Sequence, residues 1–210
     1  MIDASTITVV EHALVADCLA ALRDARTPAA LFRSTTEELG FFLAYEATRS
    51  LPADSREVRT PVGTAQVRRI SGRPIIAPIL RAGLGLLPGF VRAFSEATVA
   101  HLGFFRDPKT LEAIPYYANI PEDISQGESY VLDPMLATGH TACAALQALV
   151  SRGARTITFV CLVAAPEGVA EVKRRYPDVR IIAAAVDEGL NEHGYIVPGL
   201  GDAGDRMFGA

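Results

Sequence analysis

The residues best suited to chemistry stand in one short run between a predicted strand and a predicted helix. Asp133 ends the apolar strand 130–133, and the run continues through Thr138 and Gly139 to Thr141. Small and hydroxyl-bearing residues at the start of a helix leave backbone N–H groups free, and the helix dipole adds positive potential. The run therefore predicts a phosphate site, with both threonines as hydroxyl donors. An ordinary strand-to-helix turn with a threonine cap and a surface aspartate is the alternative that the pattern leaves open.

Two arginines stand at the ends of other predicted strands. Arg81 follows the apolar strand 74–80 and precedes Gly83 and Gly85, which let another backbone or a ligand approach closely. Arg106 follows the next apolar strand. The guanidinium group can grip phosphate with two hydrogen bonds, and 18 of the 20 cationic side chains are arginines. These positions predict a second anion site, against the alternative of a simple glycine turn with arginines facing water.

The C-terminal tail differs from the rest of the chain in glycine content and in hydrophobic periodicity. Residues 187–210 hold six of the 17 glycines and show little periodicity, so we expect neither a helix nor a central strand there. The tail offers backbone groups, the aromatic Tyr195 and the carboxylates of Asp202 and Asp205. Backbone donors and acceptors of this kind can read a planar polar heterocycle. The alternative is a surface loop, and the G-x-G-x-x-G match at 199–204 lacks the strand and helix that a dinucleotide site needs.

Strands and helices alternate along the chain, and the strands are apolar throughout. Such strands are typical of a parallel sheet that is covered on both faces, and the carboxyl ends of its strands form one edge where ligands bind. Asp133, Arg81 and Arg106 should therefore meet there. The polar stretch 106–128 is long enough to be a lid or a mobile hairpin. Helices are expected over 11–25, 29–50, 84–94, 142–152 and 167–176, and strands over 57–70, 74–80, 98–105, 130–133, 156–163 and 179–186.

Composition limits the class of protein. The chain has 210 residues, half of them hydrophobic, and a net charge of −4. We expect one soluble domain, no general nucleic-acid binding, and no membrane span, because no apolar run approaches ~18 residues. The three cysteines lack metal-like spacing, and no signal peptide is evident, so we expect reduced thiols and a cytoplasmic location.

Five runs, in chain order, give the sequence a family resemblance. They are PILRAGLG, GFFRDP, VLDPMLATGHT, VAAPEG and DEGLNEHGYIVPGLGDAGDRMFG. Together they resemble the uracil phosphoribosyltransferase family, and the resemblance extends over most of the chain. The resemblance implies an α/β, type I phosphoribosyltransferase fold, with a parallel core sheet, flanking helices and a hood over the strand ends. It divides one domain over 1–210 into a core at about 71–186 and a hood formed by the N-terminal segment and 187–210.

The implied reaction transfers the phosphoribosyl group of 5-phosphoribosyl 1-diphosphate (PRPP) to uracil, giving UMP and diphosphate, with Mg²⁺ carried by PRPP. The resemblance also implies a non-proline cis peptide within 80–83, GTP as an effector and a homo-oligomer. His140 stands where the family usually has glycine. Either that position has a left-handed backbone, or its backbone is ordinary and the ring faces solvent.

The resemblance assigns site residues position by position. The implied catalytic residues are Arg81, Arg106, Asp133 and Asp202. The implied PRPP contacts are Arg81, Arg106, Asp133, Pro134, Met135, Leu136, Ala137, Thr138, Gly139, His140, Thr141 and Asp202. The implied uracil contacts are Tyr195, Ile196, Gly201, Asp202 and Ala203.

Three other functions remain as alternatives at this stage. A regulatory RNA-binding protein on the same fold would need a basic face, which the acidic balance disfavours. An enzyme for orotate or a purine is disfavoured by the tail around 201–203. A non-catalytic nucleotide-binding module would not need Asp133 together with Arg81 and Arg106.

Overall fold

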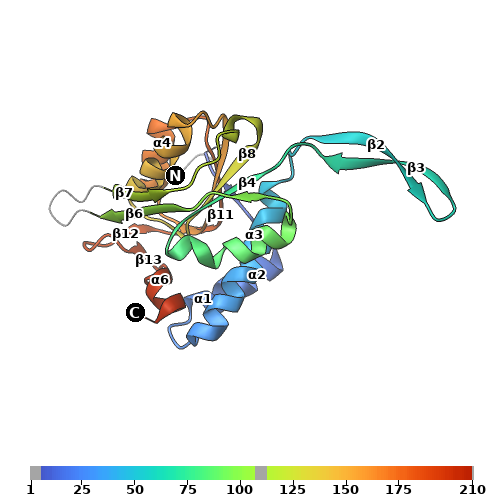
Figure 1. Cartoon of the computed structure of the whole chain (residues 1–210). Coiled ribbons are helices and arrows are strands. Elements are labelled where there is room, and N and C mark those ends of the chain that lie inside the picture. Colours follow the sequence, from blue (N-terminus) through green and yellow to red (C-terminus); the bar gives the residue numbers. More distant parts are fainter. Residues whose placement is uncertain (1–5, 107–112, 210) are drawn as a thin grey trace.

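The computed structural model of the chain describes residues 6–106 and 113–209, without the side chains of Arg106 and Ala113. A twisted central sheet runs through the molecule in the order β1-β11-β10-β8-β4-β6-β7 (Figure 1). All of its strand pairs are parallel except β6 with β7, which confirms the predicted mostly parallel sheet. The strands are β1 (Thr8–Val9), β4 (Ile75–Leu80), β5 (Thr98–Val99), β6 (Leu102–Arg106), β7 (Ala113–Ala118), β8 (Glu128–Leu132), β9 (Met135–Leu136), β10 (Thr156–Ala164) and β11 (Arg180–Val186).

Helices cover both faces of the sheet, as the apolar strands predict. On one face lie α1 (Ala13–Arg23), α2 (Ala29–Ala47) and α3 (Leu87–Ala93), and on the other lie α4 (His140–Ser151) and α5 (Pro166–Arg175). No helix in the described ranges is both long and apolar enough to cross a membrane.

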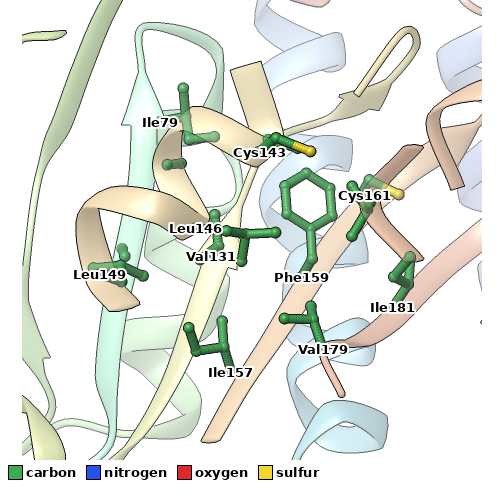
Figure 2. Close-up of a cluster of buried hydrophobic side chains, with 14 of the residues drawn as sticks. Ile79, Val131, Cys143, Leu146, Leu149, Ile157, Phe159, Cys161, Val179 and Ile181 are labelled. Carbon is green, nitrogen blue, oxygen red and sulfur yellow. The ribbon is translucent and has the colours of Figure 1, made fainter. Parts of the chain in front are cut away.

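The central strand β10 shows how the sequence builds two cores. Successive side chains of a strand point to opposite faces. Phe159 and Cys161 therefore pack among the residues of α4 and α5, whereas Val160 and Leu162 pack toward α1 and α2. Figure 2 shows Phe159 in the first of these clusters, with Leu146 of α4 close by.

A two-stranded arm projects from the body of the molecule (Figure 1). It consists of β2 (Ala53–Thr60) and β3 (Gly63–Ile70), which pair in antiparallel register. Its residues are exposed or half-buried, and Val62 at the tip is 98% exposed. The predicted strand 57–70 therefore spans the turn of a hairpin.

The segment 106–128, predicted to be a lid or a mobile hairpin, forms one strand of an antiparallel hairpin. It contains β7, which pairs with β6, and the short 3-10 helix η2 (Ile124–Gln126). Pro115 fits this strand because β7 is the edge of the sheet, where a missing N–H donor is tolerated. Residues 107–112 of the prediction lie outside the described part of the chain.

The expectation that the tail holds no helix is wrong. A hairpin of β12 (Gly189–Leu190) and β13 (Ile196–Val197) leads into α6 (Ala203–Phe208). The carboxylate of Asp202 caps this helix by accepting a hydrogen bond from the N–H of Asp205 at 2.9 Å. A short helix is stable here because one of its first free donors is satisfied and Met207 is fully buried.

Candidate active site

A hollow of about 390 Å³ opens at the carboxyl end of β8. One wall is the segment that joins β8 to α4, and the other is the tail between β12 and α6. The lining residues are Ala82, Asp133, Met135, Leu136, Ala137, Thr138, Gly139, Thr141, Ala142, His193, Gly194, Tyr195, Ile196, Gly201, Asp202, Ala203 and Gly204. The two segments predicted from sequence to bind phosphate and a heterocycle therefore share one cavity.

The first wall is built by a turn that requires glycine. Gly139 caps α4 with φ of +82°, and a Cβ there would lie 3.0 Å from the carbonyl oxygen of Gly168. The turn aims the first residues of α4 at the cavity, since Thr141 and Ala142 line it. The first N–H groups of a helix have no partner within the helix, and its dipole makes this end positive. The wall can therefore hold a phosphate.

His140 is the first residue of α4 and is exposed. The positive φ belongs to Gly139, one residue earlier, so of the two alternatives the structure supports an ordinary backbone at His140. The helix gives His140 an ordinary conformation, which explains how a side chain is accommodated there.

A pair of carboxylates faces the cavity from opposite walls. Asp133 is held at the end of β8, where its N–H donates to the carbonyl of Val160 at 3.1 Å. Burial raises the pKa of Asp133 to about 7; the N–H of Met135 lowers it, and the negative charge of Asp202 raises it further. A carboxylate in this setting gains stability when a cation or hydroxyl donors arrive.

The second wall is largely backbone. Ile196, Leu200 and Ala203 are buried in the hydrophobic core and anchor the segment. Between them Gly201 adopts φ of +77° and carries no side chain that would cover the backbone. Tyr195, which is 49% exposed, stands at the edge of the cavity. This wall can present peptide groups and an apolar surface to a planar ligand.

The structure separates some predicted site residues from the cavity. Arg81 follows a cis Leu80–Arg81 peptide, as the resemblance implied, but it does not line the hollow. Its side chain is 64% exposed, and its Nη2 lies 3.9 Å from the Asp205 Oδ1. Arg106 ends β6, and its side chain lies outside the described residues. Pro134 lies behind the wall, where its carbonyl accepts hydrogen bonds from the N–H groups of residues 162 and 163.

Several lining residues were not predicted from the sequence. They are Ala82, Ala142, His193, Gly194 and Gly204. Each lies within two residues of a predicted contact, so the motifs locate the walls but not every position in them. The clearest available signal was His193-Gly194, which directly precedes Tyr195 in the tail motif.

The chain is similar to known proteins over almost its whole length. The sequence model of the family "Uracil phosphoribosyltransferase" matches residues 9–210. The chain belongs to the uracil phosphoribosyltransferase family. Uracil phosphoribosyltransferase of Thermoanaerobacter sp. (strain X514) is 50% identical over 202 residues, which cover 96% of each chain. That of Desulfitobacterium hafniense (strain DSM 10664 / DCB-2) is 48% identical and covers 96% of this chain and 97% of its own.

Solved structures show that the fold is shared more widely than the family. The AQ2163 protein from Aquifex aeolicus superposes with a TM-score of 0.92 at 38% identity, over 96% of this chain and 97% of its own. A hypoxanthine-guanine phosphoribosyltransferase from Bacillus anthracis matches with a TM-score of 0.52 at 11% identity, over 76% of this chain and 80% of its own. The fold is that of type I phosphoribosyltransferases, as predicted.

Proposed function

We propose that this uracil phosphoribosyltransferase family member transfers the phosphoribosyl group of PRPP to uracil, producing UMP and diphosphate in pyrimidine salvage. The observation that carries the proposal is that one cavity joins a helix-start anion site, a half-buried carboxylate and a backbone wall suited to a planar base. These three parts match the phosphate, the ribose and the base of the product.

The first wall would hold PRPP. Its 5′-phosphate fits the N–H groups and hydroxyls of 137–141, and the ribose hydroxyls would donate to Asp133. The diphosphate would extend toward Arg81 and Arg106. The Arg81 guanidinium is exposed, and its contact with Asp205 is loose, at 3.9 Å. It is therefore available to pair with a diphosphate oxygen.

Mg²⁺ fits this arrangement as an ion that enters with PRPP. The carboxylates of Asp133 and Asp202 face one cavity, and Mg²⁺ in proteins is usually held by one or two carboxylates together with substrate phosphates. When bound, it would supply positive charge to the diphosphate.

The chemistry breaks the bond between ribose C1 and diphosphate and forms a bond from C1 to uracil N1. The transition state has oxocarbenium character, as in glycoside hydrolysis. Guanidinium groups stabilise the departing diphosphate, and both walls hold the reacting atoms in line. Uracil N1 loses its proton, and Asp202 is our candidate to receive it, because it lies in the wall proposed to bind the base.

The second wall would read the base. Uracil offers acceptors at O2 and O4 and a donor at N3, which suit the peptide groups of 201–203, and the buried Ile196 offers an apolar contact. Cytosine reverses the pattern at positions 3 and 4 and would leave buried peptide groups unpaired.

Four further predictions accompany this function. They are a GTP effector, a homo-oligomer, a cytoplasmic location, and the division into a core at about 71–186 with a hood from the N-terminal segment and 187–210. No nucleic-acid partner is proposed, because the chain is acidic overall.

The experiment that tests the function follows diphosphate release from PRPP. Purified protein with PRPP, Mg²⁺ and uracil should release diphosphate and form a product with the mass and retention of UMP. Omitting uracil should abolish the release. Uracil-independent release, or a wild-type protein that forms no UMP, would contradict the proposal.

A further inference from the structure

A buried ion pair behind the second wall holds the tail to the core. Asp187 follows β11, and its side chain is only 5% exposed. Arg23, the last residue of α1, donates from Nη2 to the Asp187 Oδ1 at 2.5 Å and from Nη1 to Oδ2 at 2.8 Å. The backbone N–H of Asp187 donates to the carbonyl of Ala164 on β10 at 2.9 Å, so the carboxylate is fixed to the central sheet.

The same ion pair forms hydrogen bonds with both backbone groups of Gly199. The N–H of Gly199 donates to the Asp187 Oδ2 at 2.8 Å, and its carbonyl accepts from the Arg23 Nη1 at 2.7 Å. Gly199 has φ of +60°, and a Cβ there would lie 2.2 Å from the carbonyl oxygen of Ile196. Both polar groups of a residue that must be glycine are thus fixed by one ion pair.

Arg206 fixes the other side of the same segment. Its guanidinium donates to the carbonyl of Leu200 at 2.9 Å and to that of Asp24 at 2.6 Å, and it also donates to the carbonyl of Leu22. It lies 4.3 Å from the ring centroid of Phe32, an arrangement favourable for a cation over an aromatic face. These bonds tie α6 to the end of α1, which lies beside it (Figure 1).

Neither member of the ion pair touches the cavity. Arg23, Asp187 and Gly199 are absent from the lining, whereas Ile196 and Gly201 on either side of Gly199 are part of it. A shift of Gly199 would move the peptide groups of 201–203, and hydrogen-bond recognition depends steeply on distance and angle.

We propose that Arg23 and Asp187 are positioning residues for base recognition: by clamping Gly199 they set the peptide groups of 201–203 that distinguish uracil from cytosine. The inference rests on the proposed function and deepens it. It makes base selectivity depend on an ion pair that contacts neither substrate.

A matched pair of variants separates positioning from general stability. Asp187→Ala breaks the clamp, and Glu128→Ala breaks a partly buried ion pair, Glu128 with Arg180, at the opposite end of β8 from the cavity. Both should lower the melting temperature. Only Asp187→Ala should raise the KM for uracil, by about tenfold, and lower the uracil-over-cytosine ratio of kcat/KM by at least about tenfold, with the KM for PRPP within about threefold.

Two conservative variants keep the test decisive if Asp187→Ala does not fold. Asp187→Asn retains an acceptor for the Gly199 N–H, and Arg23→Lys retains one cationic donor. Both should lose selectivity by an intermediate amount. Wild-type selectivity in a folded Asp187→Ala or Arg23→Lys protein, or an equal loss of selectivity in Glu128→Ala, would overturn the inference.

Amide hydrogen exchange tests the clamp independently of activity. Asp187→Ala should speed exchange across 199–206 by at least about tenfold, because local opening becomes easier, while Glu128→Ala should leave that segment unchanged. A wild type that makes no UMP would contradict the proposed function alone. Unchanged exchange across 199–206 in Asp187→Ala would contradict the clamp alone.

Discussion

At the scale of single residues, Asp133 is the group whose environment most favours a change of charge. Its pKa of about 7 arises chiefly from burial, with the charge of Asp202 adding to it. In the unfolded chain the pKa of this carboxyl lies near its ordinary value of 3.8. Between these values the folded chain keeps a proton that the unfolded chain has lost, so the free energy of unfolding falls as pH rises from about 4 to 7.

Asp133→Asn should remove that pH dependence. Without substrates the variant should be more stable than wild type at pH 8, by about 1 to 4 kcal/mol, and should match it near pH 4. Turnover should fall at least about tenfold because the group facing the ribose hydroxyls loses its charge. Urea unfolding at both pH values and steady-state kinetics measure these effects. The exposed Asp54→Asn on the arm is the control, and wild-type kinetics in the Asp133 variant would remove this residue from the site.

Arg81 and Arg106 are predicted to act on the charged substrate only. Alanine at either position should raise the KM for PRPP by about tenfold or more and change the KM for uracil by less than about threefold, because uracil is neutral. Titration calorimetry with PRPP and Mg²⁺ measures the affinity directly. Arg92→Ala on α3, whose guanidinium lies over the Phe41 ring, should behave as wild type. Unchanged PRPP affinity in both site variants would contradict their placement.

His140 should be dispensable. It is exposed at the start of α4 and does not line the cavity. We therefore expect its backbone N–H, rather than its ring, to meet the proposed phosphate. His140→Gly should remain active with the KM for PRPP changed by less than about tenfold, or ~1.4 kcal/mol. Kinetics between pH 6 and 8 would reveal a ring contact as a steeper loss of PRPP affinity in the wild type. A folded but inactive variant would show that the imidazole has a direct role.

At the scale of elements, the turn into α4 is where backbone conformation creates the proposed phosphate site. Gly139 and Gly153 flank the same helix, and both have positive φ, +82° and +95°. Only Gly139 adjoins the cavity, and its added Cβ would meet Gly168, whereas a Cβ at Gly153 meets only Ser125 at 3.9 Å.

Gly139→Ala and Gly153→Ala should therefore distinguish the effect of backbone strain on stability from an effect on PRPP binding. Each substitution should destabilise the fold by about 1 to 2 kcal/mol, the cost of a left-handed backbone at a residue with a Cβ. Only Gly139→Ala should also raise the KM for PRPP, by at least about tenfold. Thermal unfolding and PRPP kinetics on both proteins provide the comparison. Equal KM values for PRPP in the two variants would contradict a phosphate site at the start of α4.

The elements that the sequence failed to predict share a physical reason. The strand β7 contains Pro115 and depends on pairing with β6, so its regularity comes from a partner distant in the chain. The helix α6 spans six residues with an internal Gly204, and its stability comes from the Asp202 cap and from burial of Met207. The long apolar strands and amphipathic helices were predictable because their own periodicity specifies them.

At the scale of the whole molecule, the motifs predicted which segments meet, but not which side chains face the cavity. Parallel strands end at one edge, so Asp133, Arg81 and Arg106 could be placed near one another from topology. The tail could be brought to the same site only through the family resemblance. The position of Arg81 outside the cavity lining, the exposure of His140 and the Arg23–Asp187 clamp depend on tertiary contacts between residues up to 176 positions apart. No local pattern carries that information.

The central claim is that the cavity uses PRPP and selects uracil by hydrogen bonds to the tail backbone. A panel of bases tests it most directly, with diphosphate release measured for uracil, cytosine, orotate, hypoxanthine and adenine at fixed PRPP and Mg²⁺. We predict rapid release with uracil and a kcat/KM lower by a factor of up to ~10⁴ with cytosine, since unpaired buried peptide groups are costly. Comparable release with uracil and cytosine, or faster release with orotate or a purine, would contradict the account.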